Sequence, residues 1–334
     1  MALTNRKALQ ATAEEILEQN KYRAKRTVLL YSGIWAAGLL AVAVINFLLG
    51  IMADKMTAGV SGLDALDTVA IMETAQTVLN LAASILPTFW TMGYLFCLLR
   101  ISAGEPMEDK TLLQGFRAFG PIVRKELLWG LVMTALMTAG FYIGSILVSF
   151  TPLAQPMMEA GTLYADLSSL TDQQLTHLLQ ASAPVLIVCT AVSLLLVIPM
   201  TYRLRMSNYI LMENPRFGAL FSLLASFRMT KGHCLRLFLL ELRFWWYYAA
   251  MIVATLLSYT APALPMLGLE LAVDHNILNL ILYSVSLLII FCIQYFAANK
   301  VEMTFVQAYR ELSREAALPI TPEPTEQPRQ NPFA

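Results

Sequence analysis

The side chains that most often perform catalysis or hold metal ions are few and widely separated in this sequence. The three histidines, His177, His233 and His275, lie in different polar segments, and no metal-ligand pair is present. The sequence has no HExxH, CxxC or GKS/GKT motif, and Gly59-Val60-Ser61-Gly62 lacks the spacer of a GxSxG nucleophile turn. We therefore expect no enzymatic activity, no catalytic, cofactor-binding or metal-binding residue, and no cofactor.

Acidic residues gather between the apolar runs of the chain, but not with the spacing of a calcium loop. We interpret them as solvated loop charge. The apolar runs themselves contain no ionisable residue, whereas ion-coupled transporters usually keep one inside the helix bundle. The acidic residues in question are Asp54, Asp64, Asp67, Glu159, Asp166 and Asp172.

Uncharged features of the apolar runs are the remaining candidates for a membrane site. Pro87 lies near the middle of the second run and Pro199 near one end of the fourth, and each removes a backbone hydrogen bond from a helix. We take both as candidate helix breaks, because broken helices can form substrate sites in transporters, although most membrane prolines only kink a helix. Asn46, Asn80 and Gln294 are expected to form hydrogen bonds between helices.

The elements that carry these residues are predicted to be membrane-spanning helices. The chain has 334 residues, of which 57% are hydrophobic and 14% are charged, too few charges for an ordinary soluble domain. Uncharged apolar runs of about 20 residues recur, and each is long enough as a helix to cross ~30 Å of hydrocarbon. We expect an all-α polytopic bundle of about six spans, near 27–52, 76–99, 127–150, 183–202, 244–263 and 278–298.

The distribution of basic residues predicts the orientation of these spans. Of the 23 Lys and Arg residues, 22 fall before the first span, after the last, or in the second and fourth loops, with Lys55 the exception. Basic residues near span ends are retained in the cytoplasm. We therefore expect a multi-pass protein of the bacterial plasma membrane with both termini in the cytoplasm.

Basic and aromatic residues at the predicted cytoplasmic ends of spans are candidates for the membrane interface. Trp245 and Trp246 follow a basic loop at the start of the fifth span, as expected of an aromatic belt. Arg117, Arg228 and Lys231 lie on or beside short amphipathic stretches, where they would attract anionic lipid headgroups.

An internal repeat supports a division into similar parts. Leu112–Arg117, before the third span, and Leu223–Arg228, before the fifth, share four of six residues. Both are predicted to be short amphipathic helices, the first ending at Gly120-Pro121 and the second at Gly232, and residues 1–26 form a weaker version. The architecture is thus predicted to be three units, each an amphipathic helix followed by a two-span hairpin.

Three segments follow from these patterns. An N-terminal cytoplasmic helix covers residues 1–26, a membrane domain covers 27–315, and 316–334 is proline-rich and expected to be a disordered cytoplasmic tail. Within the third span, Gly140 and Gly144 form a GxxxG pattern, which we expect to pack inside the chain rather than between copies.

Four motifs in the second half of the chain resemble the bacterial membrane family known as domain of unknown function 975. They are RLRMSNYILMENP from Arg203, SFRMTKG from Ser226, LRLFLLELRFWWYY from Leu235 and FVQAYREL from Phe305. The resemblance is good over 200–313 and otherwise lies in topology, and it implies a membrane bundle but no activity. Matched positions are Tyr209, Asn214, Pro215, Ser226, Lys231, Gly232, Leu237, Phe238, Leu240, Leu242, Phe244, Trp245, Phe305, Tyr309 and Leu312.

Two functions remain open from the sequence, with enzymatic activity a distant third. We favour a non-enzymatic scaffold or accessory subunit of a bacterial envelope or export assembly, because catalytic and ion-coupling residues are missing. The alternative is a carrier or lipid-handling protein for an apolar or amphipathic substrate, suggested by the repeated hairpins and the two prolines. Expected partners are the bilayer, anionic lipid headgroups and a membrane protein, but not nucleic acid.

Overall fold

The structure, a computed structural model, describes residues 6–57, 63–105, 108–156, 172–260 and 275–316. Every regular element among these residues is helical, as the sequence predicts. Five of the described helices are long and apolar enough to cross a membrane, and the count is six if a bent pair is taken as one span. The protein is therefore a multi-pass membrane protein by its helix composition.

Each predicted span lies within or overlaps a helix, and most helices extend beyond the apolar run because their polar ends are also helical. The sixth run differs most, since its helix continues to Glu315 instead of ending near residue 298. The long helices are α2 (Lys21–Thr57), α3 (Leu63–Ser102), α5 (Phe119–Ser149), α7 (Asp172–Leu204) and α13 (His275–Glu315). The shorter ones are α1 (Arg6–Gln19), α4 (Gln114–Arg117), α8 (Ser207–Glu213), α9 (Gly218–Met229), α10 (Cys234–Leu242) and α11 (Trp245–Ser258). Three 3₁₀ turns join them: η1 (Asp109–Leu113), η2 (Pro152–Ala154) and η4 (Pro215–Phe217).

The chain divides into two compact units rather than three successive ones. The hairpins α2–α3 and α11–α13 belong to the first unit, and α5 and α7 to the second. The first unit comprises Met1–Ile122, Asn208–Arg216 and Leu235–Ala334. The second comprises Val123–Ser207 and Phe217–Cys234.

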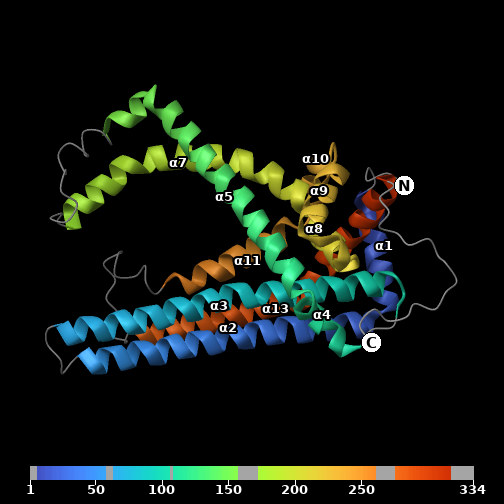
Figure 1. Cartoon of the computed structure of the whole chain (residues 1–334), viewed down its shortest axis with the longest axis horizontal. Coiled ribbons are helices and arrows are strands. Elements are labelled where there is room, and N and C mark those ends of the chain that lie inside the picture. The colour runs from blue at the N-terminus through green and yellow to red at the C-terminus, as the bar shows by residue number, and fades with distance from the viewer. Residues whose placement is uncertain (1–5, 58–62, 106–107, 157–171, 261–274, 317–334) are drawn as a thin grey trace. The chain divides into compact units, whose positions relative to one another are not determined.

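In the first unit, α2, α3 and α13 pack side by side along their length (Figure 1). The helices α1 and α11 pack against α13, while η1 and α4 pack against α3. Its densest part is the C-terminal portion of α13, which is buried on nearly all sides, as expected of a helix in the centre of a bundle. The buried residues there are Val301, Met303, Thr304, Phe305, Val306, Gln307, Ala308, Tyr309, Leu312 and Ser313.

The segment Leu112–Arg117 is not the amphipathic surface helix predicted from the repeat. It forms the end of η1 and the single turn α4, and it lies directly on the backbone of α3. A Cβ atom on Gly115 would collide with the carbonyl oxygen of Phe89, and one on Gly93 with that of Leu112. Only glycine permits this approach, so the segment is held by α3 and does not form a free face toward lipid.

The structure also describes two other places where the sequence predicts the end or the exposed face of an amphipathic helix. The Gly120-Pro121 pair does not end a helix, because α5 begins at Phe119 and the proline lies in its first turn, where it costs no hydrogen bond. The N-terminal helix α1 buries Leu9 and Ala13 and packs against α13, so this apolar face is covered by protein. The tail 316–334 lies outside the described residues except for its first position.

In the second unit, α5 and α7 approach closely through small residues. A Cβ atom on Gly140 would lie 2.5 Å from Cα of Ser193, and one on Gly144 would lie 2.7 Å from Cα of Cys189. The Ser193 hydroxyl also donates a hydrogen bond to the Met137 carbonyl, at 3.1 Å. The prediction that the GxxxG pattern packs inside the chain is confirmed.

The helix α9, which contains the second copy of the repeat, turns its small polar residues toward α7. The hydroxyls of Ser226 and Thr230 both donate to the Arg203 carbonyl at the end of α7, at 2.7 and 3.0 Å. The Arg203 guanidinium lies 4.5 Å from the centre of the Phe227 ring. The opposite face is apolar and exposed, and it consists of Leu220, Phe221 and Leu224.

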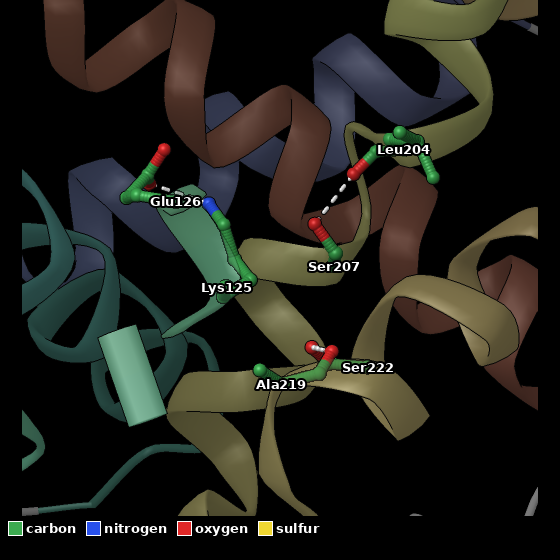
Figure 2. A network of polar contacts seen from close by, with 6 residues as sticks. All are labelled: Lys125, Glu126, Leu204, Ser207, Ala219 and Ser222. Atoms are coloured by element: carbon green, nitrogen blue, oxygen red, sulfur yellow. Dashed lines mark hydrogen bonds and ion pairs between the residues drawn. The ribbon is translucent and has the colours of Figure 1, made fainter. Parts of the chain in front are cut away.

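Short-range polar contacts stabilise the helix ends of the second unit (Figure 2). The Ser207 hydroxyl donates to the Leu204 carbonyl at 2.6 Å, where α7 gives way to α8, and Ser222 bonds three residues back along α9. The ammonium group of Lys125 lies 2.5 Å from the carboxylate of Glu126, and the Lys125 side chain is buried. Because these contacts join residues one to three positions apart, they support local structure and do not assemble a site.

Candidate functional site

The first unit contains a partly open cleft between α2, α3 and α13, with a volume of about 720 Å³. The end of α11 contributes Tyr259, the residue after its last turn. Among the described residues, no acidic, basic or histidine side chain lines it. Its apolar lining consists of Leu39, Val42, Ala43, Phe47, Gly50, Ala83 and Leu280, and its polar lining of Asn46, Gln76, Asn80, Ser84, Tyr259, Asn279 and Tyr283.

Helical spacing explains why these polar groups meet in one place. Gln76 and Asn80 are four residues apart on α3, as are Asn279 and Tyr283 on α13, so each pair lies on one face of its helix. The amide nitrogen of Asn46, on α2, donates to the amide oxygen of Asn80 at 2.8 Å. This confirms the expected interhelical hydrogen bond for these two residues.

One polar atom in the cleft is left unsatisfied by the protein. The amide oxygen of Asn46 is buried and has no hydrogen-bond partner in the described part of the chain. A buried acceptor without a donor costs about 1–3 kcal/mol. This oxygen is closed off from solvent, so a bound molecule reaches it only if the Asn46 side chain turns toward the cleft, whose volume is within the range of small-molecule sites.

Beyond the cleft, the same three helices are locked together by Asn299 of α13. The Tyr94 hydroxyl donates to the Asn299 amide oxygen at 2.7 Å, and the Asn299 amide nitrogen donates to the Ala24 carbonyl at 2.8 Å. The rings of Tyr94 and Tyr31 stack with their centres 4.4 Å apart, and the Tyr31 hydroxyl lies 3.1 Å from that of Thr91. Side chains from all three helices thus take part in a continuous set of contacts.

Two tyrosines from the family-like motifs meet further along α13. Tyr209 of α8 and Tyr309 of α13 stack with ring centres 5.5 Å apart. The Tyr209 hydroxyl donates to the Glu302 carboxylate at 3.0 Å, and the Tyr309 hydroxyl donates to that of Glu213. The motifs that the sequence places 100 positions apart therefore form one packed contact, whose role is to hold α8 against α13.

A small, partly open cavity of about 50 Å³ lies among Tyr31, Tyr94 and Tyr247. The amide oxygen of Gln294 is buried beside it and has no protein hydrogen-bond partner among the described residues. The cavity is too small for an organic molecule, and its polar lining suits water. It is lined by Tyr31, Thr91, Tyr94, Tyr247, Gln294, Ala298 and Glu302.

The uncharged run of the sixth predicted span contains no ionisable residue, but its helix α13 is longer than the run. The candidate span there extends over Ile277–Glu315 and includes Lys300, Glu302 and Arg310. The sequence argument ended the span near residue 298, because it followed the uncharged run and not the helix. Lys300 forms an ion pair with Glu14 of α1 at 2.8 Å, and Arg310 donates to the Leu99 carbonyl at 3.0 Å.

The predicted interface residues are all exposed and none of them contributes to the cleft. Arg117 lies on α4, Arg228 on α9, Lys231 just after α9, and Trp245 and Trp246 at the start of α11. This exposure is compatible with an interfacial position. Contact of these residues with lipid headgroups stays a prediction.

Neither proline that we took as a candidate helix break ends its helix. α3 continues through Pro87, and α7 continues through Pro199. The pronounced break lies between α10 and α11, which are bent by 68° around residues 243–244. A sequence argument from proline missed this break, because the break contains no proline.

The residues considered for catalysis do not assemble. Among the described residues, no three His, Cys, Asp or Glu side chains are grouped so that they could hold a metal ion. Of the histidines, His177 lies on α7 and His275 on α13, and His233 lies between α9 and α10. The acidic residues Glu159 and Asp166 lie outside the described residues.

The sequence argument identified part of the cleft and missed the rest. It selected Asn46 and Asn80, which are amides inside uncharged runs. It did not select Gln76, Asn279 or Tyr283, although their spacing of four residues from another polar residue was a usable signal. The pairing of helices was not available from the sequence, so these pairs could not be assigned to one cavity.

Comparison with known proteins gives one match. A family model described as "Protein of unknown function (DUF975)" matches residues 1–314, which is wider than the region 200–313 where the motifs are evident. Comparisons with curated proteins and with solved structures found no match. Because the family model covers nearly the whole chain, this multi-pass membrane protein belongs to the DUF975 family.

Proposed function

We propose that the protein is a carrier or lipid-handling protein that binds an apolar or amphipathic molecule in the cleft between α2, α3 and α13. The observation that carries this proposal is the cleft itself, with a volume of about 720 Å³ and a mixed lining of apolar and uncharged polar side chains. Such a lining suits a ligand with a hydrocarbon body and a neutral hydrogen-bonding group. No catalytic role is part of the proposal.

The scaffold hypothesis, which the sequence favoured, gains no comparable support. It rests on missing catalytic groups, and a tightly packed bundle without a cleft would have suited it better. The cleft favours the carrier over the scaffold, because a purely structural bundle gains nothing from an open volume lined by polar side chains.

The proposal includes a position in the bilayer. The basic residues support an orientation with both termini in the cytoplasm and three hairpins across the membrane. α2 then leaves the cytoplasm at Lys21, so the cleft residues Leu39 to Gly50 lie in its outer half. A ligand would enter from the outer leaflet or from the outer surface.

Filling the cleft tests the proposal. Ala43 on α2 and Ala83 on α3 both line it, and Ala43→Phe and Ala83→Phe would each occupy part of its volume. The matched control is Ala75→Phe on α3, an exposed position outside the cleft lining. Purified wild-type protein in liposomes should move a fluorescent lipid analogue or a hydrophobic peptide faster than empty liposomes do.

The expected result is that both cleft variants lose this transfer while the control variant keeps it. Native mass spectrometry of protein extracted from its own membranes gives a second readout. Wild type should retain a lipid or small molecule that the cleft variants lack. Transfer no faster than in empty liposomes, together with no retained molecule, would contradict the proposal.

A further inference from the structure

The chemistry of the cleft narrows the class of molecule that it can bind, provided that the proposed function is correct. All fourteen described residues that line it are uncharged. A charged headgroup drawn between the helices would lose its hydration without gaining a partner of opposite charge, which is costly in a medium of low polarity. The lining therefore disfavours the phosphate and ammonium groups of ordinary phospholipids.

The polar part of the lining is rich in groups that both donate and accept hydrogen bonds. It contains four amides, each with two N–H donors and a carbonyl acceptor, and three hydroxyls, each of which donates and accepts. A hydroxyl group on a ligand also does both. Phosphate oxygens only accept at neutral pH, and a quaternary ammonium group does neither. The amides are Asn46, Gln76, Asn80 and Asn279, and the hydroxyls are those of Ser84, Tyr259 and Tyr283.

The hydrogen bond between Asn46 and Asn80 determines which end of the Asn46 amide is left as a hydrogen-bond acceptor. Because the Asn46 amide nitrogen donates to Asn80, at 2.8 Å, the other end of the Asn46 amide is an acceptor. That acceptor is buried and has no partner in the described part of the chain. It needs a donor, and once the Asn46 side chain turns toward the cleft a ligand hydroxyl supplies one without bringing a charge.

The apolar lining accounts for the rest of such a molecule. Leu39, Val42 and Phe47 on α2 and Leu280 on α13 offer hydrocarbon surface within the same cavity. We propose that the cleft binds a lipid whose headgroup is uncharged and carries hydroxyl groups, as a sugar headgroup does, with the hydroxyls on the amides and part of the hydrocarbon on the apolar wall.

The test compares four lipids with identical acyl chains against the full chain in a polyoxyethylene detergent, which brings no sugar of its own. Monoglucosyl diacylglycerol has hydroxyls and no charge, and phosphatidylglycerol has hydroxyls and a negative charge. Phosphatidylcholine has charges and no hydroxyl, and phosphatidic acid has a phosphate alone. Binding is measured by native mass spectrometry and by the shift in the midpoint of thermal unfolding.

We expect the glucosyl lipid to bind at least tenfold more tightly than the other three. Asn46→Leu should weaken its binding about tenfold, which corresponds to the loss of one good hydrogen bond. Asn279→Leu, on the opposite wall and at an exposed position, should do the same, and it keeps the test valid if the Asn46 variant folds poorly. The control Thr74→Val, exposed on α3 outside the lining, should bind like wild type.

The outcomes separate this inference from the proposed function. If all four lipids bind equally and Ala83→Phe abolishes their binding, the cleft is a lipid site and the headgroup inference is wrong. If the charged lipids bind best, the inference is equally wrong. If none binds and the wild type retains nothing from native membranes, both proposals fail.

Discussion

The helices α2, α3 and α13 form one bundle, and its two ends differ in how completely the side chains are buried. Toward the C-terminal end of α3 and α13, side chains are almost completely buried, and Leu98 of α3 is 0% exposed. Toward the other end the same helix exposes its leucines, and Leu81 is 59% exposed. Each end has its own hydrogen bond between helices, Tyr94 to Asn299 at the buried end and Asn46 to Asn80 at the exposed end.

The difference shows how one set of helices can combine an anchor with a binding site. The closed end holds the helices at fixed positions through Asn299, which bonds to both α2 and α3. With the helices held there, the open end does not need to collapse on itself, and its polar groups remain available to a ligand. Substitutions that are chemically identical should therefore have unequal effects at the two ends.

The largest difference is expected for leucine truncation on α3. Leu98→Ala should lower the free energy of unfolding by about 2–5 kcal/mol, because it leaves a cavity in a packed core. Leu81→Ala, the same change at the open end of the same helix, should cost less than about 1 kcal/mol. The measurement is denaturation of the purified full chain in mixed micelles. Equal losses would show that the two ends are packed alike.

Next in size is the glycine contact that holds α4 on α3. Gly115→Ala should destabilise the protein by about 3 kcal/mol, because the new methyl group meets the Phe89 carbonyl, a backbone atom that cannot move aside alone. Gly120→Ala is the matched control, since nothing lies within 4 Å of its Cβ position. The control should change stability by less than about 1 kcal/mol. If the Gly115 variant were as stable as the control, the η1–α4 segment could not lie in direct contact with the backbone of α3.

A smaller effect is expected from Asn299. Asn299→Leu should cost about 1–3 kcal/mol, because it leaves the Tyr94 hydroxyl buried without its acceptor. Asn279→Leu, the same change near the other end of α13, should leave stability nearly unchanged, since that side chain is exposed. Thermal unfolding of the two variants in one detergent checks the comparison. If Asn279→Leu were the more destabilising variant, the proposed difference between the two ends would be wrong.

The smallest effect is expected at the pair of amides in the cleft. A double-mutant cycle with Asn46→Leu and Asn80→Leu should give a coupling energy of about 0.6 kcal/mol, the average for hydrogen bonds between membrane helices. Ligand binding should respond far more strongly than stability does. A coupling energy above about 2 kcal/mol would instead make this pair part of the structural anchor.

Much of the fold was predictable because it depends on local composition. The all-helical class, the multi-pass character and the approximate positions of the spans follow from uncharged apolar runs, and Gly140 and Gly144 form the expected contact inside the chain. The repeat was misleading at Leu112–Arg117, where similar residues adopt a single turn on α3 while their counterparts form α9. Amphipathic spacing alone does not distinguish packing on protein from packing on lipid.

The sequence by itself determined that long segments of this protein lie in a membrane and that these segments are helices. Runs such as 27–52 exclude water, must satisfy their backbone hydrogen bonds internally and are therefore helices. The tertiary structure alone decided where the polar groups of those helices meet. Asn46, Asn80 and Asn279 are far apart in sequence and share a cleft only because α2, α3 and α13 pack side by side. Which helices pack together depends on the fit of side chains across their interfaces, and the hydropathy of one helix carries no information about that fit.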